Sequence, residues 1–493
     1  MRQCPNSDRP RTPLKPFIFK HKYGKIKVLQ VNFNKTNMFK EYNQNQLQLL
    51  PPNLSDLVSE DHISRLINHS VDRMGLSFIE KQYSINGQRA YDPRMLLKVL
   101  VYGYSSGVRS SRKLADRLKE DIVFMWLAGG QQPDFRTISD FRKDKLQNFK
   151  IIFEQVLDTC FELGLARVGK VSIDGTKIQA SASKNKAVYR KQLARRKEFI
   201  KQKVEEIIKE AEELDKQEDE LYGNTTINRT GKVFNNKEIE QAMKKIEKQK
   251  EKLEKQKNIL KAKTQEIKAK ERKMRKDRNS FVSTDKDATV MMMKEGYIAP
   301  GYNVQLASEK QIILGYGVYS NRNDNHLLKP TLKEVEERTK RKPEIVLADK
   351  GYGNKMNYRY LKKEKITPFI PYNTYDQDRV LIKNKLYQRP KKIDRELEKY
   401  KFTQLVRLQT EMGKQMLKRR REDIEPVFGN LKRNLGFRRF DLRGKWKCEL
   451  ELGLFSVAHN FKKIQNGVKR LMKWQDGRQK TIELGTVLGY LSA

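Results

Sequence analysis

Three acidic residues of this 493-residue chain stand where they could bind metal ions. Asp174 ends the alternating run VGKVSID, Asp349 ends the apolar run EIVLAD, and Glu425 lies in a predicted helix around EDIEPVFGNLK. If the two strands end at the same edge of one sheet, the two aspartates converge there and Glu425 closes the site from the helix. Three carboxylates can hold two Mg²⁺ ions about 3.5 to 4 Å apart, an arrangement that activates a water or a hydroxyl for phosphodiester chemistry.

The helix around Glu425 also carries cations on one predicted face. Arg421, Glu425 and Lys432 are spaced by four and then seven residues, so about one and two helical turns separate them. An acid between two cations can supply a metal ligand while the cations bind phosphates. The alternative is an ordinary surface pair of Arg421 with Glu425, and an aspartate at a strand end is often only a turn or cap residue.

Amphipathic helical patterns precede the first acidic strand and fill residues 46–167. Serines and aspartates stand at the predicted helix starts, and Gly107 and Gly129 punctuate the ends. The segments SSRKLADRL and DFRTISDFRKDKL place cations on these helices, as expected of a module that lays helices on DNA. A merely solvated basic face is the alternative. The cations concerned are Arg112, Lys113, Arg117, Arg136 and Arg142.

A charged insertion, residues 183–280, follows the first acidic strand. Its second half repeats apolar residues every seven positions, although the other seam position is mostly polar. Apolar residues from Leu193 to Leu214 predict a second helix, and a loop around YGNTTINRTG separates the two. This pattern favours an antiparallel helical hairpin within one chain, with an intermolecular coiled coil as the alternative.

The remaining elements form a predicted α/β arrangement. GYNVQLAS and QIILGYGVYS read as a β-hairpin, HLLKPTLKEVEERTKR as a helix, EIVLAD as a buried strand and TPFIPYN as a further short strand. Two helices follow, around LKRRREDIEPVFGNLKRNLGF and ELELGLFSVAHNFKKI.

The charge balance indicates a polyanionic partner. The chain has 104 Lys and Arg against 61 Asp and Glu, a formal net charge of +43. No run reaches the roughly 18 apolar residues that a membrane helix needs, and three widely spaced cysteines offer neither a disulfide framework nor a cysteine-rich zinc site. We therefore expect a protein that works in a reducing cytoplasm, with no membrane partner.

Several motifs, in the same order along residues 38–465, resemble those of bacterial insertion-sequence transposases of the DDE class, close to the group called eleven-eighty-two. They are YDPRMLLKVLVYGY, PDFRTISDFRK, SIDGTKIQASASK, PGYNVQLAS, LADKGYGN and RREDIEPVFGNLKRNLGFRRF. The resemblance implies an RNase H-like α/β catalytic domain in which Asp174, Asp349 and Glu425 are the catalytic and metal-binding acids. Arg421 and Lys432 match the Arg and Lys of the Tyr-Arg-Glu-Lys signature, but Lys418 stands where the signature has its Tyr. Lys418 can neutralise a phosphate and lacks an aromatic face for stacking.

The function expected from this resemblance is metal-dependent cleavage at the ends of an insertion sequence and strand transfer of the freed 3′-hydroxyl into target DNA. Two Mg²⁺ ions per active site are the expected cofactors, with Mn²⁺ as a substitute. Duplex DNA, as terminal inverted repeats and target, is the expected partner of a homodimer assembled on DNA. The resemblance also implies a bacterial protein that is associated with the nucleoid. The alternatives are a non-enzymatic DNA-binding architectural protein, an RNase H-like nuclease without strand transfer, and an inactive, decayed transposase.

We expect four parts in the chain: a basic, irregular arm (1–45), a helical DNA-binding domain (46–167), a catalytic domain (168–465) interrupted by the helical insertion (183–280), and a tail (466–493). Weaker candidates for the site are His326 and Asp324, which follow a predicted strand. Trp446, Tyr352 and Trp474 are aromatic candidates for stacking on a base, although each is more typical of packing.

Overall fold

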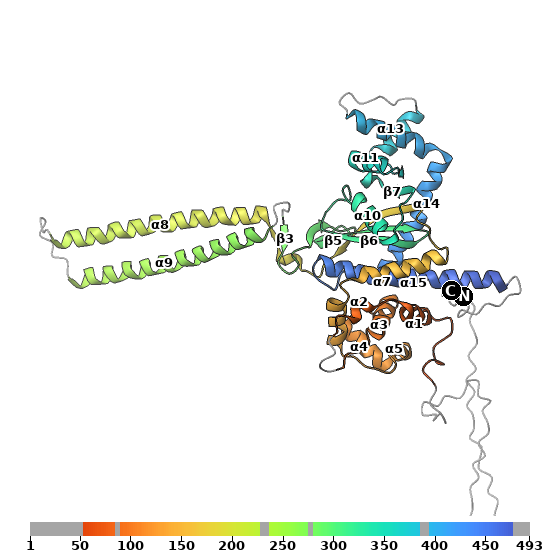
Figure 1. Cartoon of the computed structure of the whole chain (residues 1–493). Helices are drawn as coiled ribbons and strands as arrows, with labels where there is room; N and C mark the ends of the chain where they lie inside the picture. The colour runs from red at the N-terminus through yellow and green to blue at the C-terminus, as the bar shows by residue number, and fades with distance from the viewer. Residues whose placement is uncertain (1–52, 84–88, 227–235, 275–279, 385–393, 477–493) are drawn as a thin grey trace, which may run out of the picture. The chain divides into compact units, whose positions relative to one another are not determined.

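A mixed β-sheet runs through the part of the chain that carries the acidic strands (Figure 1). The computed structural model describes residues 53–83, 89–226, 236–274, 280–384 and 394–476, all within a unit that spans Asn53–Ala493. The predicted arm, residues 1–45, and the end of the predicted tail lie outside the described residues.

The sheet has the order β4-β5-β1-β7-β8, and β6 also pairs with β5. The strands are β1 (Lys170–Gln179), β4 (Thr289–Met292), β5 (Ile298–Glu309), β6 (Ile312–Tyr319), β7 (Ile345–Ala348) and β8 (Thr367–Phe369). β5 is antiparallel to β1, β4 and β6, whereas β7 is parallel to both β1 and β8. β6 is buried at seven of its eight positions because helices pack against it, which explains its nearly continuous apolar sequence.

Helices occupy the described part of the chain before β1. Asp92, Asp121 and Asp134 cap three of them by accepting hydrogen bonds from backbone N–H groups, and Pro93 opens the helix after Asp92. The helices are α1 (Ile63–Arg73), α2 (Ser77–Glu80), α3 (Pro93–Ser105), α4 (Ser111–Glu120), α5 (Ile122–Leu127), α6 (Phe135–Asp140), the π-helical turn η1 (Phe141–Lys145) and α7 (Phe149–Glu162).

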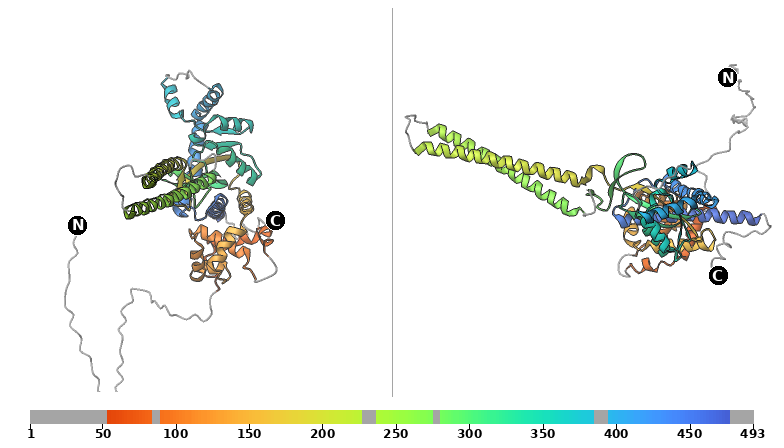
Figure 2. Two further views of the ribbon diagram at one scale, coloured as in Figure 1. Left: turned by 90° about the vertical axis from the view of Figure 1, so that its left-hand side faces the viewer. Right: turned by 90° about the horizontal axis from the view of Figure 1, so that it is seen from above.

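The insertion after β1 is a pair of long helices, α8 (Arg190–Thr226) and α9 (Asn236–Lys273), which lie side by side within the chain (Figures 1 and 2). Leu193, Ile200 and Ile267 are buried in a small apolar cluster at one end of the pair. Further along, Lys250 of α9 forms ion pairs with Asp215 and Glu218 of α8. The short strands β2 (Ala187–Tyr189) and β3 (Ser280–Val282) pair where the insertion leaves and rejoins the chain, next to the short 3₁₀ turn η2 (Lys184–Lys186).

The C-terminal helix α15 (Lys445–Asp476) packs along β6 and also contacts α1, α3 and α7. This helix contacts both the predicted helical domain and the predicted catalytic domain, so the boundary between the two domains remains a prediction. Among the described helices, none contains an apolar stretch that would span a bilayer. The other helical segments are α10 (Leu328–Thr339), η3 (Lys350–Tyr352), α11 (Lys355–Lys363), α12 (Tyr375–Lys383), α13 (Arg395–Gln409), α14 (Glu411–Gly429) and the π-helical turn η4 (Asn430–Asn434).

Candidate active site

Asp174 and Asp349 lie on neighbouring strands at the point where β7 ends. The prediction that Asp174 ends its strand is wrong, because β1 continues to Gln179 in pairing with β5. β1 and β7 are parallel neighbours in which Ile173 pairs with Ala348, so each aspartate is the next residue of its chain segment. Asp174 accepts a hydrogen bond from the Gly175 N–H at 2.8 Å, and Asp349 accepts one from the Gly351 N–H at 2.9 Å as the cap of η3. The structure thus brings together the two acids that the strand patterns single out.

Burial makes both aspartates weaker acids than usual, because it raises the pKa of each carboxyl group. Desolvation, together with the negative charge of Asp349, raises the pKa of Asp174 from 3.8 to about 6. Desolvation also raises the pKa of Asp349, although the Gly351 hydrogen bond and Arg420 act in the opposite direction. Two buried carboxylates that repel each other are stabilised by a nearby cation.

The cation that lies at these acids is Arg420 of α14. Its guanidinium is 3.8 Å from Asp174 Oδ2 and 3.8 Å from Glu425 Oε1, and its side chain is 16% exposed. The residue spacing did not predict Arg420, because Arg421 is the arginine that stands four residues before Glu425. Only the orientation of the helix selects one arginine from the run Arg419 to Arg421.

A buried acid fixes the orientation of α14. Asp423 accepts hydrogen bonds from Ser172 Oγ of β1 at 3.3 Å and from Arg419 Nε at 3.4 Å, and its carbonyl accepts one from Ser308 Oγ at 3.3 Å. Ser172 and Asp174 project from the same face of β1 because side chains alternate along a strand. The helix that is held at Ser172 therefore presents Arg420 and Glu425 toward Asp174.

The other predicted residues of this helix take different places. Lys432 donates a hydrogen bond to Thr176 Oγ1 of β1 at 2.6 Å, and burial lowers its pKa. Lys432 lies in η4, whose π-helical turn shifts it from the register of a regular α-helix. Arg421 and Lys418 are exposed, and Lys418 pairs with Glu422 at 3.8 Å. Arg421 has no ion pair among the described residues, so the pairing with Glu425 belongs to Arg420.

A further acid, Asp324, lies beside the pair. It accepts hydrogen bonds from Asn303 Nδ2 at 2.7 Å and from Gln305 Nε2 at 2.8 Å. A Cβ atom at Gly175 would stand 2.8 Å from Asp324 Oδ1 and 2.2 Å from Gln305 Nε2, so a side chain here would displace both polar groups. Tyr352 is buried and donates a hydrogen bond to Gln305 Oε1.

The remaining weak candidates lie on the surface or outside the described side chains. His326 is exposed, and Trp446 is 44% exposed on α15. The side chain of Trp474 lies outside the part that the structure describes.

The donor chemistry at this edge suits a divalent cation. Carboxylate oxygens are the ligands that Mg²⁺ and Mn²⁺ prefer, and the repulsion within the Asp174 and Asp349 pair provides the need for positive charge. Among the described residues no three His, Cys, Asp or Glu side chains are close enough to form a metal cluster. Glu425 is 56% exposed and is joined to Asp174 through Arg420 rather than directly.

The predicted DNA contacts of the helical part divide into two groups. Arg112, Lys113 and Arg136 are exposed, and the guanidinium groups of Arg112 and Arg136 lie 5.1 and 5.8 Å from the ring centroid of Phe135, which is 36% exposed. This cluster offers cations and an aromatic ring to solvent.

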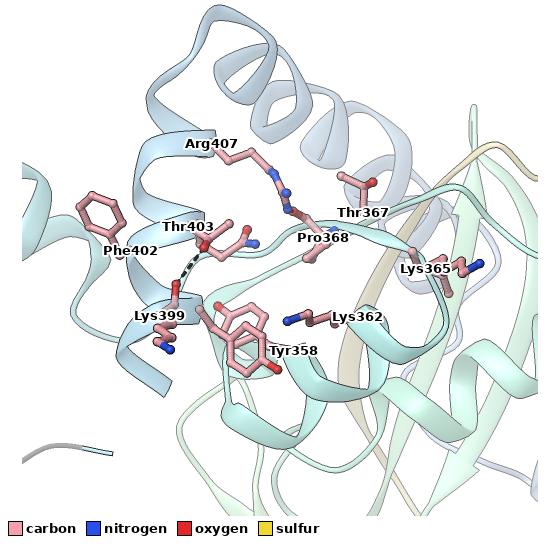
Figure 3. Close-up of a pocket in the computed structure, with 12 residues that line it drawn as sticks. Tyr358, Lys362, Lys365, Thr367, Pro368, Lys399, Phe402, Thr403 and Arg407 are labelled. Carbon is pink, nitrogen blue, oxygen red and sulfur yellow. Dashed lines mark hydrogen bonds between the residues drawn. The ribbon is translucent and has the colours of Figure 1, made fainter. Parts of the chain in front are cut away.

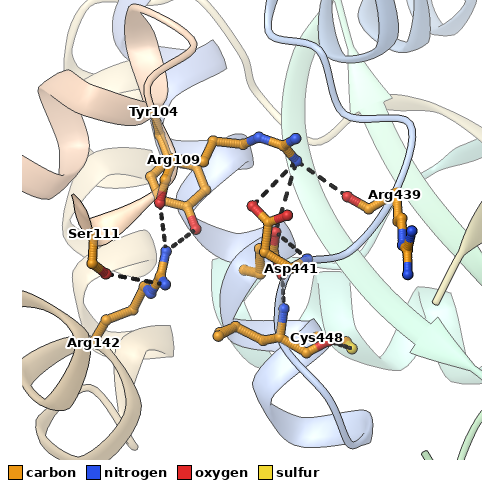
Figure 4. A network of polar contacts seen from close by, with 9 residues as sticks. Tyr104, Arg109, Ser111, Arg142, Arg439, Asp441 and Cys448 are labelled. Carbon is orange, nitrogen blue, oxygen red and sulfur yellow. Dashed lines mark hydrogen bonds and ion pairs between the residues drawn. The ribbon is translucent and has the colours of Figure 1, made fainter. Parts of the chain in front are cut away.

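The prediction that Arg142 contacts DNA at the surface is wrong, because its side chain is buried and the residue is only 5% exposed. Its guanidinium donates hydrogen bonds to Tyr104 Oη at 3.2 Å, to the Arg109 carbonyl at 2.8 Å and to Ser111 Oγ at 3.4 Å (Figure 4). These bonds hold α3, α4 and η1 together, so Arg142 does not reach a phosphate on the surface.

Two family models match the chain. Residues 52–144 match a transposase domain (DUF772), and residues 283–461 match a transposase DDE domain. The second match includes Asp349 and Glu425 and implies an RNase H-like α/β fold, with which the mixed sheet agrees. Domains of this kind typically use divalent metals. No curated protein and no solved structure matches the chain significantly.

Proposed function

Because the chain belongs to the insertion-sequence transposases of the DDE class, in line with the group eleven-eighty-two, we propose that it cuts DNA at the ends of its element and transfers the freed 3′-hydroxyl to target DNA. The observation that carries this proposal is the buried pair of Asp174, within β1, and Asp349, directly after the parallel neighbour β7. Such a pair, beside a helix that carries Glu425, provides negative charge where phosphodiester chemistry needs a metal.

In this proposal Asp174, Asp349 and Glu425 hold two Mg²⁺ ions, for which Mn²⁺ substitutes. When bound, the ions lower the pKa of a water and stabilise negative charge at the phosphate. Gly175 and Gly351 orient the two aspartates through their backbone N–H groups. Arg420 balances the acids when no metal is present and is near enough to take a phosphate oxygen of the DNA instead.

The wider DNA contacts follow from the exposed cations. Arg421 and Lys418 are exposed on the helix that carries Glu425, and half-buried Lys432 follows it in η4. Arg112, Lys113 and Arg136 lie on the helical part, which we propose reads the terminal inverted repeats. Joining two DNA ends requires two active sites, so we propose a homodimer assembled on DNA, acting at the nucleoid.

The test is cleavage and joining of a labelled duplex taken from the DNA that borders the gene, at fixed salt with Mg²⁺ or Mn²⁺. Asp349→Asn keeps the size of the side chain and removes its charge, so we expect cleavage to fall at least about 100-fold while DNA binding is retained. Asp158→Asn is the matched control, because Asp158 is an exposed aspartate of α7 outside the site. Joined products distinguish a transposase from a nuclease.

Two outcomes would contradict the proposal. If Asp349→Asn cuts as fast as the wild type, the carboxylate pair does not carry the reaction. If the wild type binds the duplex and cuts with neither metal, the chain is a DNA-binding or decayed protein.

A further inference from the structure

A pocket lies between α11, β8 and α13, on the part of the chain between Asp349 and Glu425 (Figure 3). Its volume is about 650 Å³, within the range of sites that bind a single small ligand. Thr367, which lines it, pairs with Ile345 at the start of β7, whereas Asp349 follows the end of the same strand. The pocket and the candidate active site therefore lie toward opposite ends of β7.

The lining of this pocket is positively charged. Lys362, Lys365, Lys399 and Arg407 all line it, and none of the described residues that line it is Asp or Glu. Within the described ranges none of the four cations forms an ion pair. Arg407 donates a hydrogen bond to the Pro368 carbonyl at 2.9 Å, and burial without an acidic partner lowers its pKa.

The acids on the neighbouring helices are already paired with other cations. Glu364 pairs with Lys342, Glu398 pairs with Lys401 at 2.8 Å, and Glu396 pairs with Lys355 and Arg359. The positive charge of the pocket is thus left uncompensated by the acids nearest to it in the sequence. An anion that binds among these cations would therefore not have to displace an acidic partner.

Aromatic rings form another part of the wall. Tyr358 and Tyr400 lie with their ring centroids 5.8 Å apart, and Phe402 is 57% exposed at the rim. Figure 3 shows Lys362 from α11 and Arg407 from α13 reaching into the space beside Tyr358 and Pro368. Cations together with an exposed aromatic ring are the combination that binds a phosphate and stacks on a base.

We propose that this pocket binds one unpaired nucleotide of a DNA strand, with its phosphate on Lys362, Lys399 and Arg407 and its base against Phe402 or Tyr400. A duplex cannot enter a recess of this size between two helices, whereas a single nucleotide can. The inference rests on the proposed function only in taking DNA as the source of the nucleotide.

The test measures binding of the full-length protein to a labelled oligothymidylate strand of about 12 nucleotides and to a duplex of the same length, by fluorescence anisotropy in EDTA. In the double variant Lys362→Ala and Lys399→Ala we expect about tenfold weaker binding of the strand and a salt dependence reduced by about one ion. Duplex binding should change less than about twofold, because the remaining surface cations bind it.

The matched control is the double variant Lys363→Ala and Lys333→Ala. Both are exposed lysines of α11 and α10 that do not line the pocket and form no ion pair within the described ranges. The control should bind the strand as the wild type does. If the pocket variant does not fold, as judged by thermal unfolding, Phe402→Leu carries the test, with about fivefold weaker strand binding expected from lost stacking.

Equal losses for the pocket and control variants, or equal losses for strand and duplex, would overturn the proposal. If thymidine monophosphate at equal concentration displaces the strand, the pocket is a site for free nucleotides. That result would overturn the proposal that the bound nucleotide belongs to a DNA strand. Because the assay contains no divalent metal and no cleavage step, its result is independent of whether Asp349→Asn abolishes cutting.

Discussion

Asp174 is the residue on which the opposing electrostatic effects of the site converge. Burial and Asp349 raise its pKa to about 6, whereas the Gly175 N–H, Arg420 and Lys294 favour its charged form. The charged form is the one that binds a metal. The metal-free protein therefore retains an acid whose ionisation works against folding, and a divalent cation would relieve that cost.

This conflict predicts a pH dependence of stability. Because the folded-state pKa of Asp174 lies above its ordinary value of 3.8, the folded protein binds this proton more tightly than the unfolded chain. The stability that the protonated Asp174 carboxyl contributes is fully present below about pH 4 and is lost as the pH rises through about 6. In EDTA, we expect Asp174→Asn to gain stability relative to the wild type by on the order of 2 kcal/mol between pH 4 and pH 7.

Urea unfolding at several pH values measures this difference. Asp158→Asn, on the surface of α7, should run parallel to the wild type and serves as the control. Parallel curves for wild type and Asp174→Asn would show that the carboxylate ionises in the folded protein as it does in the unfolded chain.

The sequence predicted the residues of this site unevenly. The meeting of Asp174 and Asp349 was predictable because each follows an apolar run and β1 and β7 are parallel neighbours. The end of the first strand was not, because β5 extends the pairing of β1 to Gln179. The sequence could not predict that Arg420, rather than Arg421, lies at the acids, because the orientation of α14 depends on the burial of Asp423 against Ser172. The place of Lys432 depends on a π-helical turn that no residue spacing indicates.

At the scale of elements, a buried polar network ties α3 and α4 to the start of α15. Arg109 lies 3.9 Å from Glu451 and 3.7 Å from Asp441, and it donates a hydrogen bond to the Arg439 carbonyl at 3.1 Å (Figure 4). Glu451 is fully buried and accepts from the Asp441 and Leu442 N–H groups, and desolvation raises its pKa to about 7. Arg142 supports this network by bonding to the Arg109 carbonyl.

We expect Arg142→Met to lower the free energy of unfolding by about 3 kcal/mol, because it leaves Tyr104 Oη and the Arg109 carbonyl without their donor. Arg136→Ala, at an exposed position two turns away in sequence, should leave stability within about 0.5 kcal/mol and weaken DNA binding instead. Chemical denaturation and DNA titration of both variants separate the two roles. An Arg142→Met protein of wild-type stability would contradict the interior role.

The helical segments themselves followed from periodicity and caps, as in α3 after Asp92. The burial of Arg142 did not, because a cation beside Phe141 on an amphipathic segment resembles a surface residue. The π-helical turn η1 turns it toward Tyr104 instead.

At the scale of the whole molecule, the helical pair α8 and α9 is inserted through a single narrow joint. Tyr189 of β2 pairs with Ser280 of β3, so the two ends of the insertion stand directly opposite each other. None of the residues described between them contacts Asp174, Asp349 or Glu425 by a hydrogen bond or ion pair. The apolar residues at the base, Leu193 and Met274, pack with Phe281 rather than with the main sheet.

This joint predicts that the insertion can be removed without unfolding the rest. Replacement of residues 190–279 by Asn-Gly supplies the two-residue turn that an antiparallel pair accepts, so β2 and β3 can keep their register. We expect the melting temperature to fall by less than about 5 °C, the cost of exposing part of Phe281. Metal-dependent nicking of an end duplex should persist and should disappear when Asp349→Asn is added. A shortened chain that unfolds, or one that folds and binds DNA but no longer nicks it, would show that the helical pair takes part in building the active site.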